Sequence, residues 1–307
     1  MDKATGQPNV NSQSKGALGF EFHYRTAFGD RWPRIKQALL TESKRIVRAN
    51  SFAETSATQN ELWSRQPLPF APGCFIATDD GSPVQISRDQ QGLLTGYVQD
   101  PASTLAARLV EAPEDGRVLD LCAAPGGKSL ILAERYAPRG DLVLNERSAS
   151  RRKRLLQVLK DYVPAELRRR IRVHQHDGRL WGKHEPSAYD AILLDAPCSS
   201  EGHVLHDQAA LEQWSIKRIQ RLTREQLALL RSAVSALRPS GQLVYCTCAL
   251  AVQENDGVIE ELLDRDSRVS VLETRLPLGE ATRFGWHILP DTSGYGPLFV
   301  ARLLKRS

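Results

Sequence analysis

Two cysteines stand in short motifs that each accompany an apolar run. Cys198 ends the motif Asp-Ala-Pro-Cys after the run 191–194, and Cys248 ends Tyr-Cys-Thr-Cys at the close of the run 243–246. If both runs are parallel strands, both thiols lie at the edge of the sheet where ligands bind. A thiolate in that place is a good nucleophile when nearby positive charge or a helix N-terminus lowers its pKa. Both cysteines are therefore candidates for covalent chemistry.

A pyrimidine is the substrate class that calls for this chemistry. Carbon 5 of cytosine is a poor nucleophile until a thiolate adds to carbon 6, after which the enamine-like ring can take a methyl group from a sulfonium. A metal site is not expected, because Cys246-x-Cys248 has no second ligand pair at suitable spacing. His174 and His176 alternate around a strand end and should point to opposite faces. Cys122 and Cys246 lie within apolar runs and are expected in the core.

The stretch that ends at Ser129 could bind a cofactor. An apolar run, Val118–Cys122, breaks at Pro125-Gly126-Gly127 and is followed by a helical pattern from Lys128. Backbone N–H groups at the start of a helix point at a docked ligand, and glycines let that ligand approach closely. The dinucleotide fingerprint G-x-G-x-x-G is absent, which argues against a nicotinamide cofactor.

Acidic residues end the next three predicted strands. Glu146 follows the glycines by about twenty positions, a spacing at which an acid accepts hydrogen bonds from ribose hydroxyls. Asp177 could accept a hydrogen bond from an adenine amino group, and Asp195 ends the following strand. Strand ends of this kind suit an adenosine ligand with a positive appendage. S-adenosylmethionine has that form.

Strands and helices alternate in the pattern from residue 97 onward. We expect strands at Val118–Cys122, Leu142–Asn145, Ile171–His174, Ala191–Leu194 and Leu243–Cys246. We expect helices from Asp100-Pro101 to about Ala112 and at Lys128–Tyr136, Ala149–Tyr162, Leu211–Leu237 and Glu254–Leu263, with a turn at Pro239-Ser240-Gly241. Repeated β-α units predict an α/β fold with a mainly parallel, doubly wound sheet covered on both faces.

The first 96 residues divide into a tail and an extension. Residues 1–16 are polar and predict a disordered tail. In the extension, 17–96, a helix should start at Trp32-Pro33 and carry an apolar stripe that includes Leu40, Ile46 and Val47. Residues 64–96 predict an irregular, β-containing connector with Cys74 buried. The basic residues of the extension form either a solvated face or an RNA-contacting surface: Arg25, Arg31, Arg34, Lys36, Lys44, Arg45 and Arg48.

Composition sets the general class of the protein. The chain has 307 residues, a net charge of +5 and a pI of about 9.0, and this mild basic bias suits a polyanionic partner. It has no run of ~20 apolar residues, so no membrane span is expected. Five cysteines, an odd number without a secretory signal, predict free thiols in a reducing compartment and hence the cytoplasm.

Three motifs occur in an order that resembles a known family. Asp120-Leu-Cys-Ala-Ala-Pro-Gly-Gly-Lys128, Asp195-Ala-Pro-Cys198 and Tyr245-Cys-Thr-Cys248 resemble the signature of the Sun-domain (RsmB/Nop/Sun) RNA cytosine-5 methyltransferases. The likeness covers roughly 97–306, and the compact form of the chain is most similar to the mitochondrial members and their bacterial relatives. The resemblance implies a class I, Rossmann-like, S-adenosylmethionine-dependent methyltransferase domain over 97–307, preceded by a mixed helical and irregular extension.

The resemblance also implies roles for single residues. Cys248 is the nucleophile that attacks carbon 6, Cys198 is the thiol that helps release the product, and Asp195 also contacts the cytosine. The implied S-adenosylmethionine site consists of Cys122, Ala123, Ala124, Pro125, Gly126, Gly127, Lys128, Glu146, Arg151, Asp177, Gly178 and Asp195. The family usually has serine where Cys246 and Ala249 stand here. Its attached RNA-binding modules are not recognisable in residues 1–96.

Three functions remain open at this point. The first is methylation of carbon 5 of a cytosine in ribosomal or transfer RNA, with the base unpaired or flipped out, phosphates held by basic residues at 151–154 and 168–170, and a protein partner allowed but not required. The second is DNA cytosine methylation, in which Cys198 would be the nucleophile. The third is a catalytically idle RNA-binding or ribosome assembly factor. The presence of both Cys198 and Cys248 favours an enzyme, but the sequence does not name the RNA or the cytosine.

Overall fold

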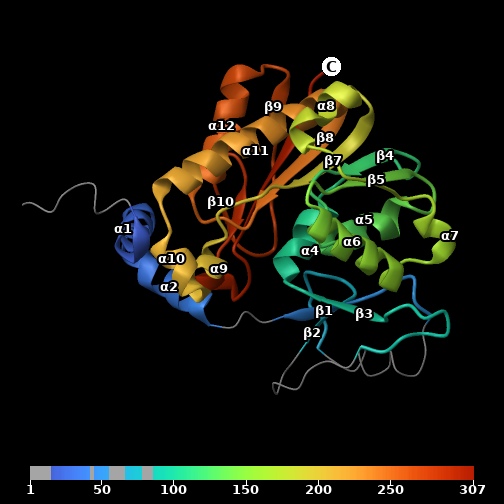
Figure 1. The fold of residues 1–307 in the computed structure, drawn as a ribbon, viewed down its shortest axis with the longest axis horizontal. Coiled ribbons are helices and arrows are strands. Elements are labelled where there is room, and N and C mark those ends of the chain that lie inside the picture. Colours follow the sequence, from blue (N-terminus) through green and yellow to red (C-terminus); the bar gives the residue numbers. More distant parts are fainter. Residues whose placement is uncertain (1–14, 42–44, 55–65, 78–85) are drawn as a thin grey trace, which may run out of the picture.

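The computed structural model describes residues 15–41, 45–54, 66–77 and 86–307, and Figure 1 shows its ribbon. Within these residues the largest sheet has nine strands in the order β10-β11-β12-β8-β7-β4-β5-β6, with β9 beside β12. Its strands are β4 (Arg117–Asp120), β5 (Asp141–Asn145), β6 (Arg172–His174), β7 (Tyr189–Asp195), β8 (Leu237–Thr247), β9 (Val269–Leu272), β10 (Glu280–Ala281), β11 (Trp286–Ile288) and β12 (Leu298–Lys305).

The strand directions explain where a ligand can bind. The five strands β6, β5, β4, β7 and β8 are parallel, whereas β12 and the strands beyond it pair antiparallel. The chain moves from β4 outward to β6 and then returns to place β7 on the other side of β4, so the topology switches between β4 and β7. The carboxyl ends of strands at such a point form a binding crevice. The predicted doubly wound, Rossmann-like sheet is confirmed.

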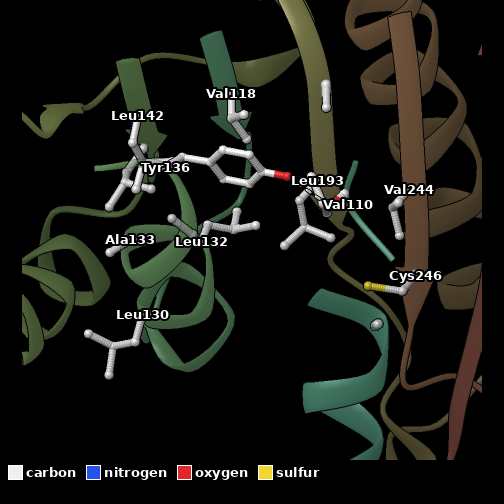
Figure 2. Packing of buried hydrophobic residues seen from close by; sticks show 14 of the residues in the cluster. Val110, Val118, Leu130, Leu132, Ala133, Tyr136, Leu142, Leu193, Val244 and Cys246 are labelled. Atoms are coloured by element: carbon white, nitrogen blue, oxygen red, sulfur yellow. Dashed lines mark hydrogen bonds between the residues drawn. The ribbon is translucent and has the colours of Figure 1, made fainter. Parts of the chain in front are cut away.

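Helices cover both faces of this sheet because its strands are apolar on both sides. On one face lie α4 (Pro101–Arg108), α5 (Gly127–Tyr136) and α6 (Ala149–Tyr162), and on the other lie α8 (Trp181–His184), α11 (Ile216–Ala236) and α12 (Asp256–Arg265). Val118 belongs to the first core cluster and its neighbour Leu119 to the second, as strand alternation requires. Figure 2 shows Leu130, Leu132 and Tyr136 of α5 in the first cluster.

The two N-terminal helices pack against helices from the C-terminal half of the chain. α1 (Gly16–Phe28) and α2 (Trp32–Leu40) lie beside α9 (Glu201–His206), α10 (Gln208–Glu212) and α13 (Pro290–Ser293) (Figure 1). Tyr24 and Trp32 are buried against Trp214 and Leu250 in a separate aromatic cluster. These two helices therefore share a core with residues far along the sequence.

A second, small sheet corrects one expectation. β1 (Ile46–Ala49) pairs antiparallel with β2 (Cys74–Ile76) and β3 (Gly96–Gln99). The helical stripe was expected to include Ile46 and Val47, but the helix ends at Leu40, whose side chain is exposed. The β-branched pair enters a sheet whose partner strands are distant in sequence, and a local periodicity cannot reveal those partners. The predicted burial of Cys74 is confirmed.

Two of the predicted domain limits can be compared with the observed helices and strands. Residues 1–14 of the expected tail lie outside the described residues, and Gly16 already begins α1. The boundary predicted between residues 96 and 97 falls within β3, which pairs with β1 of the extension. The small sheet also contacts the catalytic part, because Asn50 Nδ2 donates to the carbonyl oxygen of Tyr162 at 3.0 Å. The division into domains stays a prediction.

Element ends differ from the sequence pattern where tertiary contacts decide. The helix expected over 211–237 is two helices, because Ser215 is extended and the side chain of Trp214 enters the aromatic cluster. Residues 239–241 were predicted as a turn, but they lie inside β8 as a bulge, with Tyr189 opposite Leu237 and Ala191 opposite Gln242. The helix that begins at Pro101 ends at Arg108, before the expected end. The remaining helices are α7 (Ala165–Arg168), η2 (Gly29–Arg31), η3 (Gly178–Leu180) and η4 (Val252–Glu254).

Candidate active site

A cavity of about 480 Å³ lies over the carboxyl ends of β4 and β7. Its wall includes the whole predicted loop 122–128 together with Asp120 and Asp195. The cavity therefore opens at the topological switch point, where the strand order predicts a ligand. Cys122 lines this cavity while also packing against the second core cluster, so it belongs to both places that the sequence suggested.

The glycine loop comes close to its neighbours, which leaves no room for larger residues. Gly126 has φ +119, and a Cβ there would lie 3.0 Å from Val158 and 3.1 Å from Leu155. A Cβ on Gly127 would lie 2.9 Å from the ring of Tyr97. α5 begins at Gly127, and the first N–H groups of a helix have no carbonyl partner within it. The loop therefore presents backbone donors to the cavity without a side chain in the way.

Two carboxylates at strand ends keep an oxygen without a partner. Asp120 is buried, and its Oδ2 accepts a hydrogen bond from Ser129 Oγ at 2.7 Å, whereas its Oδ1 has no partner among the described residues. Burial raises the pKa of Asp120 to about 7. Glu146 is 4% exposed, and its Oε1 accepts from the Ser148 N–H at 2.8 Å, but its Oε2 is likewise unpartnered within the described chain. Buried acceptors of this kind are suited to a ligand's hydroxyl or amino group.

Arg151 joins the predicted ribose acid to the glycine loop. Its Nη2 donates to the carbonyl oxygen of Ala124 at 2.6 Å, and its Nη1 lies 3.3 Å from Glu146 Oε2 without hydrogen-bond geometry. Neither Arg151 nor Glu146 is among the described residues that line the cavity. The two residues hold one side of the cradle from behind.

Asp177 and Gly178 lie further from the cavity. The Asp177 carboxylate binds Arg179 Nε through both oxygens, at 2.9 and 3.0 Å, and the Arg179 guanidinium lowers the pKa of Asp177. Gly178 is packed so tightly that a Cβ would lie 2.8 Å from Leu229. The structure therefore places these two positions at the end of β6, where Asp177 already has a cationic partner.

Asp195 is held between a lysine and a thiol. Lys128 Nζ lies 2.7 Å from Asp195 Oδ2, and Cys246 Sγ donates to Asp195 Oδ1 at 3.4 Å. Burial alone would lower the pKa of Lys128, but the Asp195 carboxylate outweighs it and the pKa lies above its ordinary value. Cys246 is fully buried, as expected, yet it also orients a predicted site residue.

Cys198 and Cys248 meet, as the two motifs predicted. Their sulfur atoms are 3.0 Å apart, and Ser200 Oγ lies 3.2 Å from Cys248 Sγ. The Cys198 thiol and the Ser200 hydroxyl lower the pKa of Cys248 below its ordinary value, although burial acts in the opposite direction. The pKa of Cys198 is raised, first by the hydrogen bond with Cys248 and then by burial. Of this pair, Cys248 is the thiol that ionises first.

Part of the cavity wall comes from residues that the sequence did not single out. Besides Arg45, one of the basic residues already predicted as a face in the extension, the wall includes Tyr97, Gln99 and Ser103 from the segment that precedes β4 and His203 from α9. These residues carry no motif of their own. The only sequence feature that could have indicated them was the helix start at Asp100-Pro101, which lies shortly before β4.

Most of the basic residues predicted as a face in the extension form ion pairs with acidic residues of the same chain. Arg31 Nε pairs with Asp291 Oδ2 at 2.8 Å, and Lys36 Nζ pairs with Glu21 Oε2 at 2.9 Å. Arg34 also contacts Asp291, Arg25 contacts Glu21, the buried Arg48 binds Glu134, and Lys44 lies outside the described residues. On α6, by contrast, Lys153 and Arg154 are exposed. The basic surface is thus weaker on the extension than its composition suggests.

Metal and membrane expectations can be compared with the described residues. In that part of the chain no group of three or more His, Cys, Asp and Glu side chains is placed to hold a metal, and no helix is long and apolar enough to cross a membrane. The five cysteines are unpaired. The expected opposite orientation of His174 and His176 is wrong, because residues two apart along an extended chain share a face; their rings are 5.3 Å apart and both pack near Trp181.

Comparisons with known proteins match this geometry. The family model described as 16S rRNA methyltransferase RsmB/F matches residues 107–304. The chain is 34% identical over 306 residues to 5-cytosine rRNA methyltransferase NSUN4 of Bos taurus, covering 87% of this chain and 79% of that protein. It is 32% identical over 315 residues to the mitochondrial tRNA (cytosine(34)-C(5))-methyltransferase of Mus musculus, covering 93% and 89%. The solved structure of NSun6 from Pyrococcus horikoshii is 20% identical with a TM-score of 0.76, covers 94% of this chain and 97% of that one, and bears on the fold alone.

Proposed function

Since this chain belongs to the 16S rRNA methyltransferase RsmB/F family, we propose that it methylates carbon 5 of an RNA cytosine through a covalent bond between Cys248 and carbon 6. The chain is an RNA cytosine-5 methyltransferase that uses S-adenosylmethionine. The observation that carries the covalent step is the pair of thiols, 3.0 Å apart, of which Cys248 ionises more easily. The substrate is a cytosine in ribosomal or transfer RNA.

The residues present fit S-adenosylmethionine, which supplies a methyl group on a positively charged sulfur. The fit rests on one oxygen each of Asp120 and Glu146 that accepts no hydrogen bond from the described residues, and on a glycine loop in which a Cβ would meet neighbouring side chains. In this proposal Glu146 accepts from the ribose hydroxyls, and Asp177 accepts from the adenine amino group while Arg179 holds it. Residues 122–128, Gly178 and Asp195 complete the site, and Arg151 fixes Glu146 against the loop.

The protein's own residues then act in sequence on the cytosine. The Cys248 thiolate bonds to carbon 6, and Asp195, oriented by its contacts with Lys128 and Cys246, binds the polar edge of the ring. After carbon 5 has gained the methyl group, Cys198 gives up its own proton to solvent and its thiolate takes the proton from carbon 5. The electron pair of that C–H bond forms the double bond between carbons 5 and 6 and expels Cys248 as a thiolate. The contact with Cys248 is the first cause of the raised pKa of Cys198. Once Cys248 is bonded to the ring, that contact changes, and Cys198 can lose its own proton more easily.

RNA must reach the cavity as an unpaired or flipped-out base, because carbon 6 is inaccessible within a stacked duplex. Lys153 and Arg154 on α6, with Arg45 and His203 at the cavity wall, are the proposed phosphate contacts. A protein partner that guides the enzyme to its RNA is compatible with this arrangement. The unpaired cysteines suit a reducing compartment, and we propose the cytoplasm.

Methyl transfer from labelled S-adenosylmethionine to separate pools of ribosomal and transfer RNA tests the proposal. We expect label in one RNA pool, and bisulfite sequencing should place it at a single cytosine. Methylation of DNA but not of RNA would support the DNA reading, in which Cys198 attacks. Absence of label from every pool, with intact S-adenosylmethionine binding, would contradict the proposal and favour an idle assembly factor.

A further inference from the structure

Two fully buried carboxylates lie beneath the loops that carry the thiols. We name residues 197–200 the first cysteine loop and residues 247–251 the second cysteine loop. Glu201 and Glu254 are each 0% exposed, although carboxylates are almost never fully buried without partners. The hydrogen bonds of Glu201 and Glu254 therefore show which parts of the structure these two carboxylates hold in place.

Glu201 connects the two cysteine loops directly. Its Oε2 accepts a hydrogen bond from the backbone N–H of Leu250 at 2.9 Å, in the second cysteine loop. Its Oε1 accepts a hydrogen bond from the hydroxyl of Ser199, the residue next to Cys198 in the first cysteine loop. A single side chain thus fixes the separation of the two backbones that carry Cys198 and Cys248.

Tyr24 of α1 completes this connection from the extension. Its buried hydroxyl donates to Glu201 Oε1 across 177 positions of sequence. The ring is fixed by Phe20, Trp32 and Trp214, so the hydroxyl cannot easily turn away. The extension therefore supplies a hydrogen bond to the residue that joins the cysteine loops.

Glu254 secures the first cysteine loop from the other side. Its Oε2 accepts from the Ser199 N–H at 3.0 Å and from Gln226 Nε2 at 2.7 Å, and the same amide nitrogen donates to the Pro197 carbonyl at 2.8 Å. Burial raises the pKa of Glu254 to about 7, and the charge of Glu201 adds to this rise.

We propose that Glu201, oriented by Tyr24, is a positioning residue that sets the approach of Cys198 and Cys248. This rests on the proposed function, and it gives α1 a role in supporting the two cysteine loops. Displacement of reacting groups by about 1 Å can cost on the order of a hundredfold in rate. Loss of one hydrogen bond to Glu201 should therefore lower the rate of the chemical step and leave RNA affinity intact.

The first test compares two tyrosine variants that each lose one buried hydroxyl. Tyr24→Phe removes the bond to Glu201, whereas Tyr136→Phe removes a bond of 2.9 Å from a tyrosine of α5 to the Val110 carbonyl (Figure 2). With the full-length enzyme, Tyr24→Phe should lower kcat by about tenfold and change the KM for RNA by less than about twofold. Tyr136→Phe should leave kcat unchanged at equal folded fraction.

A second readout needs no methylation, so it separates this inference from the proposed function. Diamide takes up two electrons and two protons as Cys198 and Cys248 join in a disulfide, and the rate reports how often the sulfurs meet. Tyr24→Phe and Glu201→Ala should slow this closure relative to Tyr136→Phe, and Glu201→Gln, which keeps an acceptor, should restore part of it. Unchanged closure and kcat in folded Tyr24→Phe, or equal losses in both tyrosine variants, would overturn the positioning role.

Discussion

The glycine loop and the two cysteine loops lie at the same edge of the sheet, where Lys128 pairs with Asp195 at the end of β7, yet different contacts hold the loops in place. The backbone donors of the glycine loop follow from its own sequence, because β4 ends and α5 begins there, although Arg151 and Tyr97 also contact the loop. The two cysteine loops are connected to each other by side chains from remote elements, among them Tyr24 and Gln226. The strand, turn and helix of the glycine loop are thus local in sequence, whereas the distance between the thiols depends on distant packing.

The cysteines show the same contrast in their chemistry. Cys246 lies in β8 and Cys122 follows β4, and burial raises the pKa of both thiols. Cys248 is also poorly exposed, but donors from Cys198 and Ser200 lower its pKa. Hydrogen bonds to the thiolate, more than burial, therefore decide which sulfur reacts. If the glycine loop and the cysteine loops are held independently, a substitution that impairs one of them should leave the properties of the other unchanged.

The largest separable effect is expected on the glycine-loop side. Glu146→Ala removes the proposed ribose acceptor and should weaken S-adenosylmethionine binding by about 2–4 kcal/mol, since hydrogen bonds to a charged group are lost. The rate of alkylation of Cys248 by iodoacetamide should not change. Calorimetry and peptide mass spectrometry measure the two quantities. Glu225→Ala, which breaks the nearby pair with Arg147, is the matched control. Unchanged affinity in folded Glu146→Ala would remove the ribose assignment.

On the cysteine side, we expect a shift in pH dependence. Cys198→Ala removes the thiol that stabilises the Cys248 thiolate, so the pKa of Cys248 should rise. Alkylation follows the thiolate, and its midpoint should therefore move to higher pH. Cys198→Ser keeps a donor and should move it less. Alkylation measured across pH, with S-adenosylmethionine affinity as the control, checks this. A midpoint that stays fixed or falls in Cys198→Ala would contradict the assignment of Cys248 as the more acidic thiol.

The smallest effect is expected at the junction of the two sides. Cys246→Ser retains a donor to Asp195 in a similar volume, so the free energy of unfolding should change by less than about 1.5 kcal/mol. Methyl transfer should be close to that of the unaltered chain. Cys246→Ala, which lacks the donor, should lower kcat more than Cys246→Ser. Equal activities of these two variants would show that the contact with Asp195 has no role in the reaction.

The same contrast explains what could be predicted from the sequence. Val118, Gly126, Glu146 and Asp195 were placed correctly at one edge of a parallel sheet, because strand runs, glycines and strand ends are local patterns. Two motifs also brought Cys198 and Cys248 together. The contact between Tyr24 and Glu201 spans 177 positions, and no local pattern signals it.

The misplaced strand β1 shows the same limit. Ile46 and Val47 match a helical period, but their partners in β2 and β3 come from segments that the period does not include. The ion pairs of the basic residues in the extension were also not predicted, since Arg31 and Lys36 pair with acidic residues that only the fold brings near. Residues used by distant contacts cannot be told from solvated ones by composition.

The most direct test of the thiol assignment is denaturing electrophoresis of the enzyme with its RNA and S-adenosylmethionine. If Cys248 attacks carbon 6 and Cys198 serves release, Cys198→Ser should accumulate a denaturant-resistant complex that nuclease removes. Cys248→Ser and the double variant should form none, and Cys248→Ser should lose methyl transfer. A complex trapped by Cys248→Ser, together with loss of methyl transfer in Cys198→Ser, would contradict the account and assign the attack to Cys198.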